Sequence, residues 1–208
     1  MKLQVALDEV TLSEGINLIH QIENDVDIIE VGTPLVIREG MQAVRQFKQR
    51  FPTKEILADE KIVDGGAFEA NLGFEAGADY VTVVSITDNL TIQSCIQAAN
   101  ARGKKTVVDL IGCPDLATRV SELEKMGAHM LSVHTGADQQ AVGRRPLADL
   151  KVVQQFASNI ALSVAGGINS QTIASYVALQ PEVVIVGSGI CKTANPAQAA
   201  HAIKQSLN

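Results

Sequence analysis

The sequence has little that would suit it to nucleic acids or membranes. It has no tryptophan and only 3% aromatic residues, and its 17 lysines and arginines form no long run and are outnumbered by 23 acidic residues. Nucleic-acid binding depends on cations that neutralise phosphates and on aromatic faces that stack with bases, so we expect no nucleic-acid partner. No apolar stretch is long enough to cross a bilayer, and we expect no membrane partner.

Cysteine is also scarce. Cys95, Cys113 and Cys191 are an odd number and show no CxxC spacing, which favours reduced thiols over disulfides or a zinc site. The N-terminus, Met1-Lys2-Leu3-Gln4, lacks the charged, apolar and small-residue pattern of a signal peptide. Both observations predict a cytoplasmic location.

What is present is the composition of a folded domain. The 208 residues are 46% hydrophobic and only 19% charged, which excludes an intrinsically disordered chain. This length is enough to bury a sizeable core, and no linker or low-complexity stretch divides it. We therefore predict one domain over residues 1–208.

One pattern repeats along the chain: a short apolar run, rich in β-branched residues, is followed by a segment with apolar residues at helical spacing. The runs begin 22 to 31 residues apart, which is about the length of one βα unit. They are Leu3–Leu7, Asp27–Val31, Ile56–Ala58, Tyr80–Val84, Thr106–Asp109, Met130–His134, Ala161–Ala165 and Val183–Val186.

Eight such units predict an α/β protein with a closed (β/α)8 TIM barrel. The runs are continuously apolar, as in parallel strands that are covered by helices. The alternative is an open doubly wound sheet, which would usually carry a glycine-rich phosphate turn after its first strand. Here the first run ends in Leu7-Asp8-Glu9, which disfavours that alternative.

Polar residues follow the apolar runs, where the loops of a barrel converge on one mouth and hold its active site. The third unit is the densest, with Asp59, Lys61 and Asp64 in the pattern D-x-K-x-x-D. Residues two apart in a strand share a face, so Asp59 and Lys61 are expected to point into the mouth. A lysine between carboxylates stays protonated and suits oxyanion stabilisation better than Schiff-base chemistry. The alternative is a surface ion-pair cluster.

Two further features predict a metal and a base. Glu30 and Asp59 end neighbouring strands, and their mutual repulsion would be relieved by Mg2+, although a shared proton or a lysine could do the same. His134 ends the sixth run, where a neutral imidazole can act as a general base. The alternative for His134 is a hydrogen bond within the barrel rim.

Glycines follow the seventh and eighth runs. Gly166-Gly167 and Gly187-Ser188 fall where barrels usually bind phosphate, since backbone N–H groups there can approach a ligand and a following helix N-terminus attracts anions. The alternative is plain tight turns. The sequence thus predicts a local site for a phosphorylated anion on an acidic protein.

These motifs resemble the orotidine-monophosphate-decarboxylase-like barrels over essentially the whole chain. The resemblance is strongest to two families among them, the 3-hexulose-6-phosphate synthases and the 3-keto-L-gulonate-6-phosphate decarboxylases (KGPDC). The most specific segments are Asp59-x-Lys61-x-x-Asp64, Asp27-Ile28-Ile29-Glu30-Val31-Gly32-Thr33-Pro34 and Val164-Ala165-Gly166-Gly167. The resemblance implies a homodimer with sites at the subunit interface and Mg2+-assisted chemistry through a 1,2-enediolate.

The resemblance also implies roles for residues. Glu30 and Asp59 would hold the metal, Lys61 would stabilise the enediolate, and Asp64 would reach into the partner subunit's site. His134 would remove a proton. Substrate would contact Asp8 and Asp109, and its phosphate the pairs Gly166-Gly167 and Gly187-Ser188.

Two positions favour the synthase over the decarboxylase. Ala137 stands where the decarboxylase pattern has an arginine three residues after the histidine, and the fifth strand ends in Asp109 rather than glutamate. Ser188 replaces another arginine of the decarboxylase pattern, so phosphate binding would rest more on backbone donors. The expected activity is an aldehyde-lyase that joins formaldehyde to D-ribulose 5-phosphate. Decarboxylation of 3-keto-L-gulonate 6-phosphate and non-catalytic phosphosugar binding are the alternatives.

Overall fold

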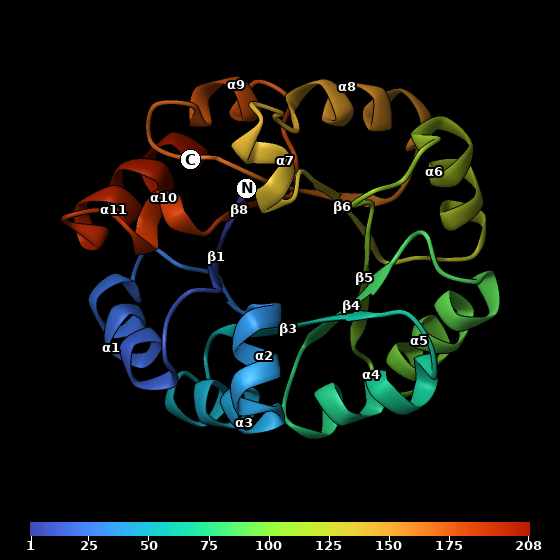
Figure 1. Ribbon diagram of the computed structural model, residues 1–208, viewed down its shortest axis with the longest axis horizontal. Coiled ribbons are helices and arrows are strands. Elements are labelled where there is room, and N and C mark those ends of the chain that lie inside the picture. The colour runs from blue at the N-terminus through green and yellow to red at the C-terminus, as the bar shows by residue number, and fades with distance from the viewer.

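The computed structural model describes residues 1–208 and shows a closed barrel of eight parallel strands in chain order, with β8 paired to β1 (Figure 1). This confirms the predicted (β/α)8 architecture. The strands are β1 (Lys2–Leu7), β2 (Ile28–Val31), β3 (Glu55–Ile62), β4 (Tyr80–Val84), β5 (Lys105–Asp109), β6 (Met130–His134), β7 (Ala161–Ala165) and β8 (Val183–Val186).

Helices surround the strands. They are α1 (Leu12–Ile22), α2 (Thr33–Glu39), α3 (Met41–Arg50), α4 (Gly66–Glu75), α5 (Asn89–Ala101), α6 (Leu116–Lys125), α7 (Ala137–Ala141), α8 (Leu147–Phe156), α9 (Ile173–Val177), α10 (Ser188–Cys191) and α11 (Pro196–Leu207). In the view of Figure 1, α2 and α7 lie closer to the barrel axis than the outer ring. None of the helices has both the length and the apolar character that crossing a membrane requires.

The strands are buried on both faces because they separate two apolar layers. A cluster of 47 buried residues packs between the barrel and its helices. A second cluster fills the barrel interior and closes its lower part, so the cavity opens only above it. The interior cluster consists of Ala6, Ile28, Leu57, Tyr80, Val107, Met130, Ala165, Val183 and Ile185.

The third strand differs from its prediction. Seven strands lie within one residue of the expected bounds, but β3 continues to Ile62 and does not end at Ala58. Its pairing with β4 shifts register between Ala58 and Ile62, and Lys61 inside this bulge has φ +47°. A bulge re-aims side chains without ending a strand, and strained backbone of this kind is common at functional sites. Asp59 and Lys61 therefore lie within β3.

Helix ends follow local rules. Gly77, Gly103 and Gly127 lie just after α4, α5 and α6 with positive φ, as their positions predict. Asp88 caps α5, since its carboxylate accepts a hydrogen bond of 2.8 Å from the N–H of Leu90. This acidic residue beyond a strand is a helix cap.

Candidate active site

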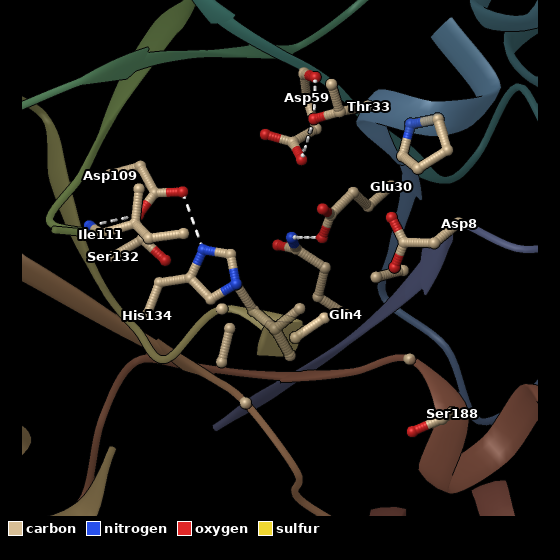
Figure 2. A pocket seen from close by; sticks show the side chains of 18 of the residues that line it. Gln4, Asp8, Glu30, Thr33, Asp59, Asp109, Ile111, Ser132, His134 and Ser188 are labelled. Carbon is tan, nitrogen blue, oxygen red and sulfur yellow. Dashed lines mark hydrogen bonds and ion pairs between the residues drawn. The ribbon is translucent and has the colours of Figure 1, made fainter. Parts of the chain in front are cut away.

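A cavity of about 500 Å³ opens at the carboxyl ends of the strands (Figure 2). Every predicted site residue except Asp64 borders it, and these residues come from the ends of seven of the eight strands, all but β4. These residues are Asp8, Glu30, Asp59, Lys61, Asp109, His134, Gly166, Gly167, Gly187 and Ser188.

Asp59 accepts more hydrogen bonds than any other carboxylate of the cavity. Its Oδ2 accepts hydrogen bonds from Thr33 (2.7 Å) and from Lys61, and its Oδ1 accepts one from Thr82 (2.8 Å). Burial would raise the pKa of Asp59, but the charge of Lys61 and these hydrogen bonds together lower it. Asp59 is therefore held as a carboxylate.

Lys61 is held as an ammonium. Its Nζ pairs with Asp59, lies 3.2 Å from the Thr33 hydroxyl and 3.7 Å from Asp109 Oδ2. Burial would lower the pKa of Lys61, but the charges of Asp59 and Asp109 raise it above its ordinary value. This direction agrees with the prediction of a protonated lysine, although its second carboxylate within this chain is Asp109 and not Asp64.

Glu30 lies at the end of β2, is 8% exposed, and accepts a hydrogen bond of 2.6 Å from the Gln4 side chain. Burial and the negative charges of Asp59 and Asp8 raise the pKa of Glu30 well above its ordinary range. A cation that binds both Glu30 and Asp59 would stabilise the ionised form of Glu30. Figure 2 shows Glu30 and Asp8 across the cavity from His134 and Asp109.

Asp8 lies in the loop after β1, against the start of α2. A Cβ at Gly32 would stand 2.2 Å from Asp8 Oδ1, so only glycine leaves room for this carboxylate. A Cβ at Gly187 would stand 3.5 Å from its Oδ2. Burial and the charge of Asp59 raise the pKa of Asp8. Asp8 thus connects the carboxylate side of the cavity with the glycine loop after β8.

His134 and Asp109 form a hydrogen-bonded pair. His134 Nδ1 lies 2.9 Å from Asp109 Oδ2, while Asp109 Oδ1 accepts 2.9 Å from the N–H of Ile111. Burial would lower the pKa of His134, but the hydrogen bond and charge of Asp109 raise it overall. Nε2 of His134 has no hydrogen-bond partner in the protein. Asp109, predicted to bind substrate, holds the imidazole in place.

The two glycine loops are built differently. Gly166 has φ +126°, and a Cβ there would lie 2.7 Å from the Thr135 carbonyl oxygen, so the loop packs too tightly for any side chain. Gly187 directly precedes α10, as predicted. The helix that follows Gly167 is farther away, because α9 begins only at Ile173.

Asp64 lies outside the cavity of its own chain. It is exposed after β3, and its Oδ1 accepts 2.7 Å from the N–H of Gly65. Large apolar side chains are exposed near it: Val63, Phe68 and Leu72 in the same segment, and Ile86 and Leu90 after β4. The two segments touch, since the Thr87 hydroxyl donates to the Val63 carbonyl. The predicted action of Asp64 on a partner subunit stays a prediction.

Several polar residues of the cavity were not predicted. Gln4, Thr82 and Ser132 lie inside apolar strands and point into the cavity. A polar residue within a buried strand is itself a signal, because its burial requires a partner. Gln140 on α7 borders the cavity and donates 2.7 Å to the Thr135 carbonyl, but nothing in its helical context marks it.

Known proteins match this chain over almost all of its length. A family model for the orotidine 5'-phosphate decarboxylase / HUMPS family matches residues 1–203. The crystal structure of 3-hexulose-6-phosphate synthase from Salmonella typhimurium is 56% identical, covers 100% of this chain and 98% of that chain, and superposes with a TM-score of 0.99. The 3-hexulose-6-phosphate synthase of Bacillus subtilis (strain 168) is 40% identical over 207 residues, covering 100% of this chain and 99% of its own.

A more distant structure also superposes well. A crystal structure of KGPDC from Streptococcus mutans is 28% identical, covers 99% of this chain and 96% of that chain, and has a TM-score of 0.90. The superposition on these two crystal structures agrees with the fold described above. The chain belongs to the orotidine 5'-phosphate decarboxylase / HUMPS family.

Proposed function

We propose that the protein joins formaldehyde to D-ribulose 5-phosphate and so forms D-arabino-hex-3-ulose 6-phosphate. The names of its full-length relatives support this lyase activity. The geometry that carries the proposal is Asp109 Oδ2, which lies 2.9 Å from His134 Nδ1 and 3.7 Å from Lys61 Nζ. A base and a fixed ammonium thus face one cavity.

His134 is the proposed base. With Nδ1 held by Asp109, neutral Nε2 removes a proton from C1 of the ketose, which leaves a 1,2-enediolate. The enediolate carbon then attacks the carbon of formaldehyde, and a new C–C bond forms. The proton on His134 returns to the oxygen of the former formaldehyde, so that no net acid or base is consumed.

Lys61 is the proposed oxyanion stabiliser. Its ammonium is fixed by Asp59 and Thr33 before substrate binds, so little reorganisation accompanies the appearance of negative charge on the enediolate. An amine held in its protonated form is not a nucleophile, and the route therefore contains no Schiff base.

The carboxylates fit Mg2+ as the proposed cofactor. Glu30 and Asp59 supply oxygen ligands of the type that Mg2+ prefers. An added cation would also offset the repulsion of Glu30 by the negative charges of Asp59 and Asp8. No group of three or more His, Cys, Asp or Glu is arranged to enclose a metal, so remaining ligands would come from substrate and water. When bound, Mg2+ supplies Lewis-acid polarisation of the ketone and the adjacent hydroxyl.

The proposed assembly is a homodimer in which Asp64 completes the partner's site. Its support is the exposed apolar surface around Asp64, since such patches commonly mark interfaces. We expect that mixing and refolding together two inactive variants, Asp64→Asn and Lys61→Met, restores about a quarter of the wild-type activity, because half of the dimers then carry one intact site of two. No recovery in the mixture would exclude shared sites.

The main test is an assay of the purified protein with formaldehyde and D-ribulose 5-phosphate. We expect a hexulose phosphate product, loss of activity in EDTA, and recovery on addition of Mg2+. The alternative substrate is 3-keto-L-gulonate 6-phosphate. Product from that compound alone would reverse the assignment and make the protein a decarboxylase. Ala137, which borders the cavity after His134, and Asp109 are the two positions that favour the synthase.

The remaining predictions concern the surroundings of the enzyme. All three cysteines are free, in agreement with the prediction of reduced thiols. A cytoplasmic location remains part of this proposal, and its measurement is cell fractionation followed by the activity assay.

A further inference from the structure

The cavity holds far more acidic than basic side chains. Five carboxylates border it, and only two lysines and no arginine do so. Lys61 is already engaged by Asp59 and Asp109 at the β3 and β5 side of the cavity. Lys192 is therefore the one lysine that these inner carboxylates do not hold. The five acidic residues are Asp8, Glu9, Glu30, Asp59 and Asp109.

Lys192 lies four residues after Ser188 of the predicted phosphate loop. It is the C-cap of the short helix α10, which begins after Gly187, and its N–H donates 3.1 Å to the Ser188 carbonyl. Its Nζ pairs with Glu9 Oε2 at 2.6 Å, and the two side chains are 54% and 69% exposed. An ion pair this open to solvent contributes little, so exchange of its partner costs little free energy.

A cation beside this loop would strengthen phosphate binding. Asp8 lies beside Gly187, and Glu9 follows Asp8 in the sequence. Two acidic side chains therefore lie near the Gly187 and Ser188 loop, which would receive the phosphate dianion. Backbone N–H groups carry only partial positive charge, and an ammonium adds a charge-assisted hydrogen bond.

We propose that Lys192 binds the phosphate group of the substrate, and that Glu9 is its partner while the phosphate is absent. The inference rests on the proposed function only in that the ligand is a phosphorylated sugar. When the sugar phosphate enters, the Lys192 ammonium exchanges Glu9 for a phosphate oxygen. The Gly187 and Ser188 loop and Lys192 then form one phosphate subsite.

The first test is the variant Lys192→Met, with dissociation constants measured by titration calorimetry for D-ribulose 5-phosphate and for inorganic phosphate. We expect both constants to rise about fivefold to tenfold, the size of one partly exposed charge-assisted hydrogen bond, and KM to change more than kcat. The control is Lys151→Met on α8, an exposed lysine in no ion pair, which makes the same change in net charge. Equal effects in the two variants would overturn the proposal.

The second test is a double-mutant cycle with Glu9→Gln. This variant frees Lys192, so we expect it to tighten phosphate binding about twofold to threefold, as loss of a weak competing ion pair allows. In the Lys192→Met background the same change should have no effect. If Glu9→Gln also tightens phosphate binding in the Lys192→Met background, Glu9 acts by repelling the phosphate and not by pairing with Lys192, which would contradict the exchange.

The two proposals fail in different ways. If the protein does not combine formaldehyde with D-ribulose 5-phosphate, yet Lys192→Met weakens binding of inorganic phosphate, the proposed function falls and the subsite stands. If turnover is normal and Lys192→Met binds both ligands as the wild type does, the subsite is wrong.

Discussion

The two sides of the cavity are built on different principles. The ends of β2, β3, β5 and β6 present charged or titratable side chains, and two pairs of these hold one another in place: Asp59 with Lys61, and Asp109 with His134. The ends of β7 and β8 present glycines and backbone groups instead. This contrast indicates a division of labour, in which one side performs proton transfer and oxyanion stabilisation and the other binds phosphate. Variants on the first side should lower kcat, and those on the second should raise KM.

The largest effect is expected from Lys61→Met. Removing the ammonium takes away the preorganised charge for the enediolate, and we expect kcat to fall about 10³-fold. Steady-state kinetics with D-ribulose 5-phosphate measures this loss. Lys48→Met is the control. Lys48 lies outside the cavity, and its Nζ is 2.8 Å from Asp79 Oδ2. A Lys61→Met enzyme that keeps a tenth of its kcat would contradict the role. Borohydride added with substrate should trap no adduct in the wild type.

The next effect is expected from Asp109→Asn. The base form of His134 is neutral, so kcat/KM should rise with pH through the pKa of His134, which Asp109 raises. Without that carboxylate, burial dominates and lowers this pKa, so the acidic limb should move to lower pH while the plateau falls about 10²-fold. A pH–rate profile measures both.

The control for this shift is Asp88→Asn, which removes a helix-capping carboxylate outside the cavity and should leave the acidic limb in place. An Asp109→Asn profile with the wild-type limb would mean that His134 is not the titrating base.

On the glycine side, Gly166→Ala is expected to act on KM. The residue has φ +126°, and its Cβ would meet the Thr135 carbonyl at 2.7 Å, so the loop must shift. We expect KM for D-ribulose 5-phosphate to rise about tenfold with a smaller change in kcat, in line with the usual cost of local strain. Gly143→Ala is a matched control, because its φ of +90° carries similar strain without contact to the cavity. If Gly166→Ala lowers kcat and leaves KM unchanged, the glycine side of the cavity does not act through phosphate binding, and the proposed division of labour is wrong.

The smallest effect is expected from Ser188→Ala. If backbone N–H groups bind the phosphate, the hydroxyl is dispensable, and KM should change less than about threefold, the value of one weak hydrogen bond. A tenfold rise in KM measured under the same conditions would show that the Ser188 hydroxyl, and not the backbone, recognises the phosphate.

Prediction from sequence succeeded where one short-range rule applies to each unit. Apolar runs and helical spacing locate seven strands to within one residue, and the chemistry at strand ends follows from the barrel itself. It failed at β3, because the bulge around Lys61 depends on pairing with β4 and leaves no mark in the local pattern. It did not find the contact between Asp109 and His134, since a contact across neighbouring strands is not visible in the spacing of residues along the chain.

The sequence by itself determined the barrel and the set of polar residues at its mouth, because period, length and residue type act locally along the chain. Only the tertiary structure decided which carboxylate holds Lys61, which one orients His134, and that Glu9 meets Lys192 from the far end of the chain. The pairing of strands joins those partners, and the pairing of β1 with β8 brings Glu9 and Lys192 together although they are 183 positions apart. Coulombic and hydrogen-bond energies depend on such distances in space, and no pattern along the chain contains them.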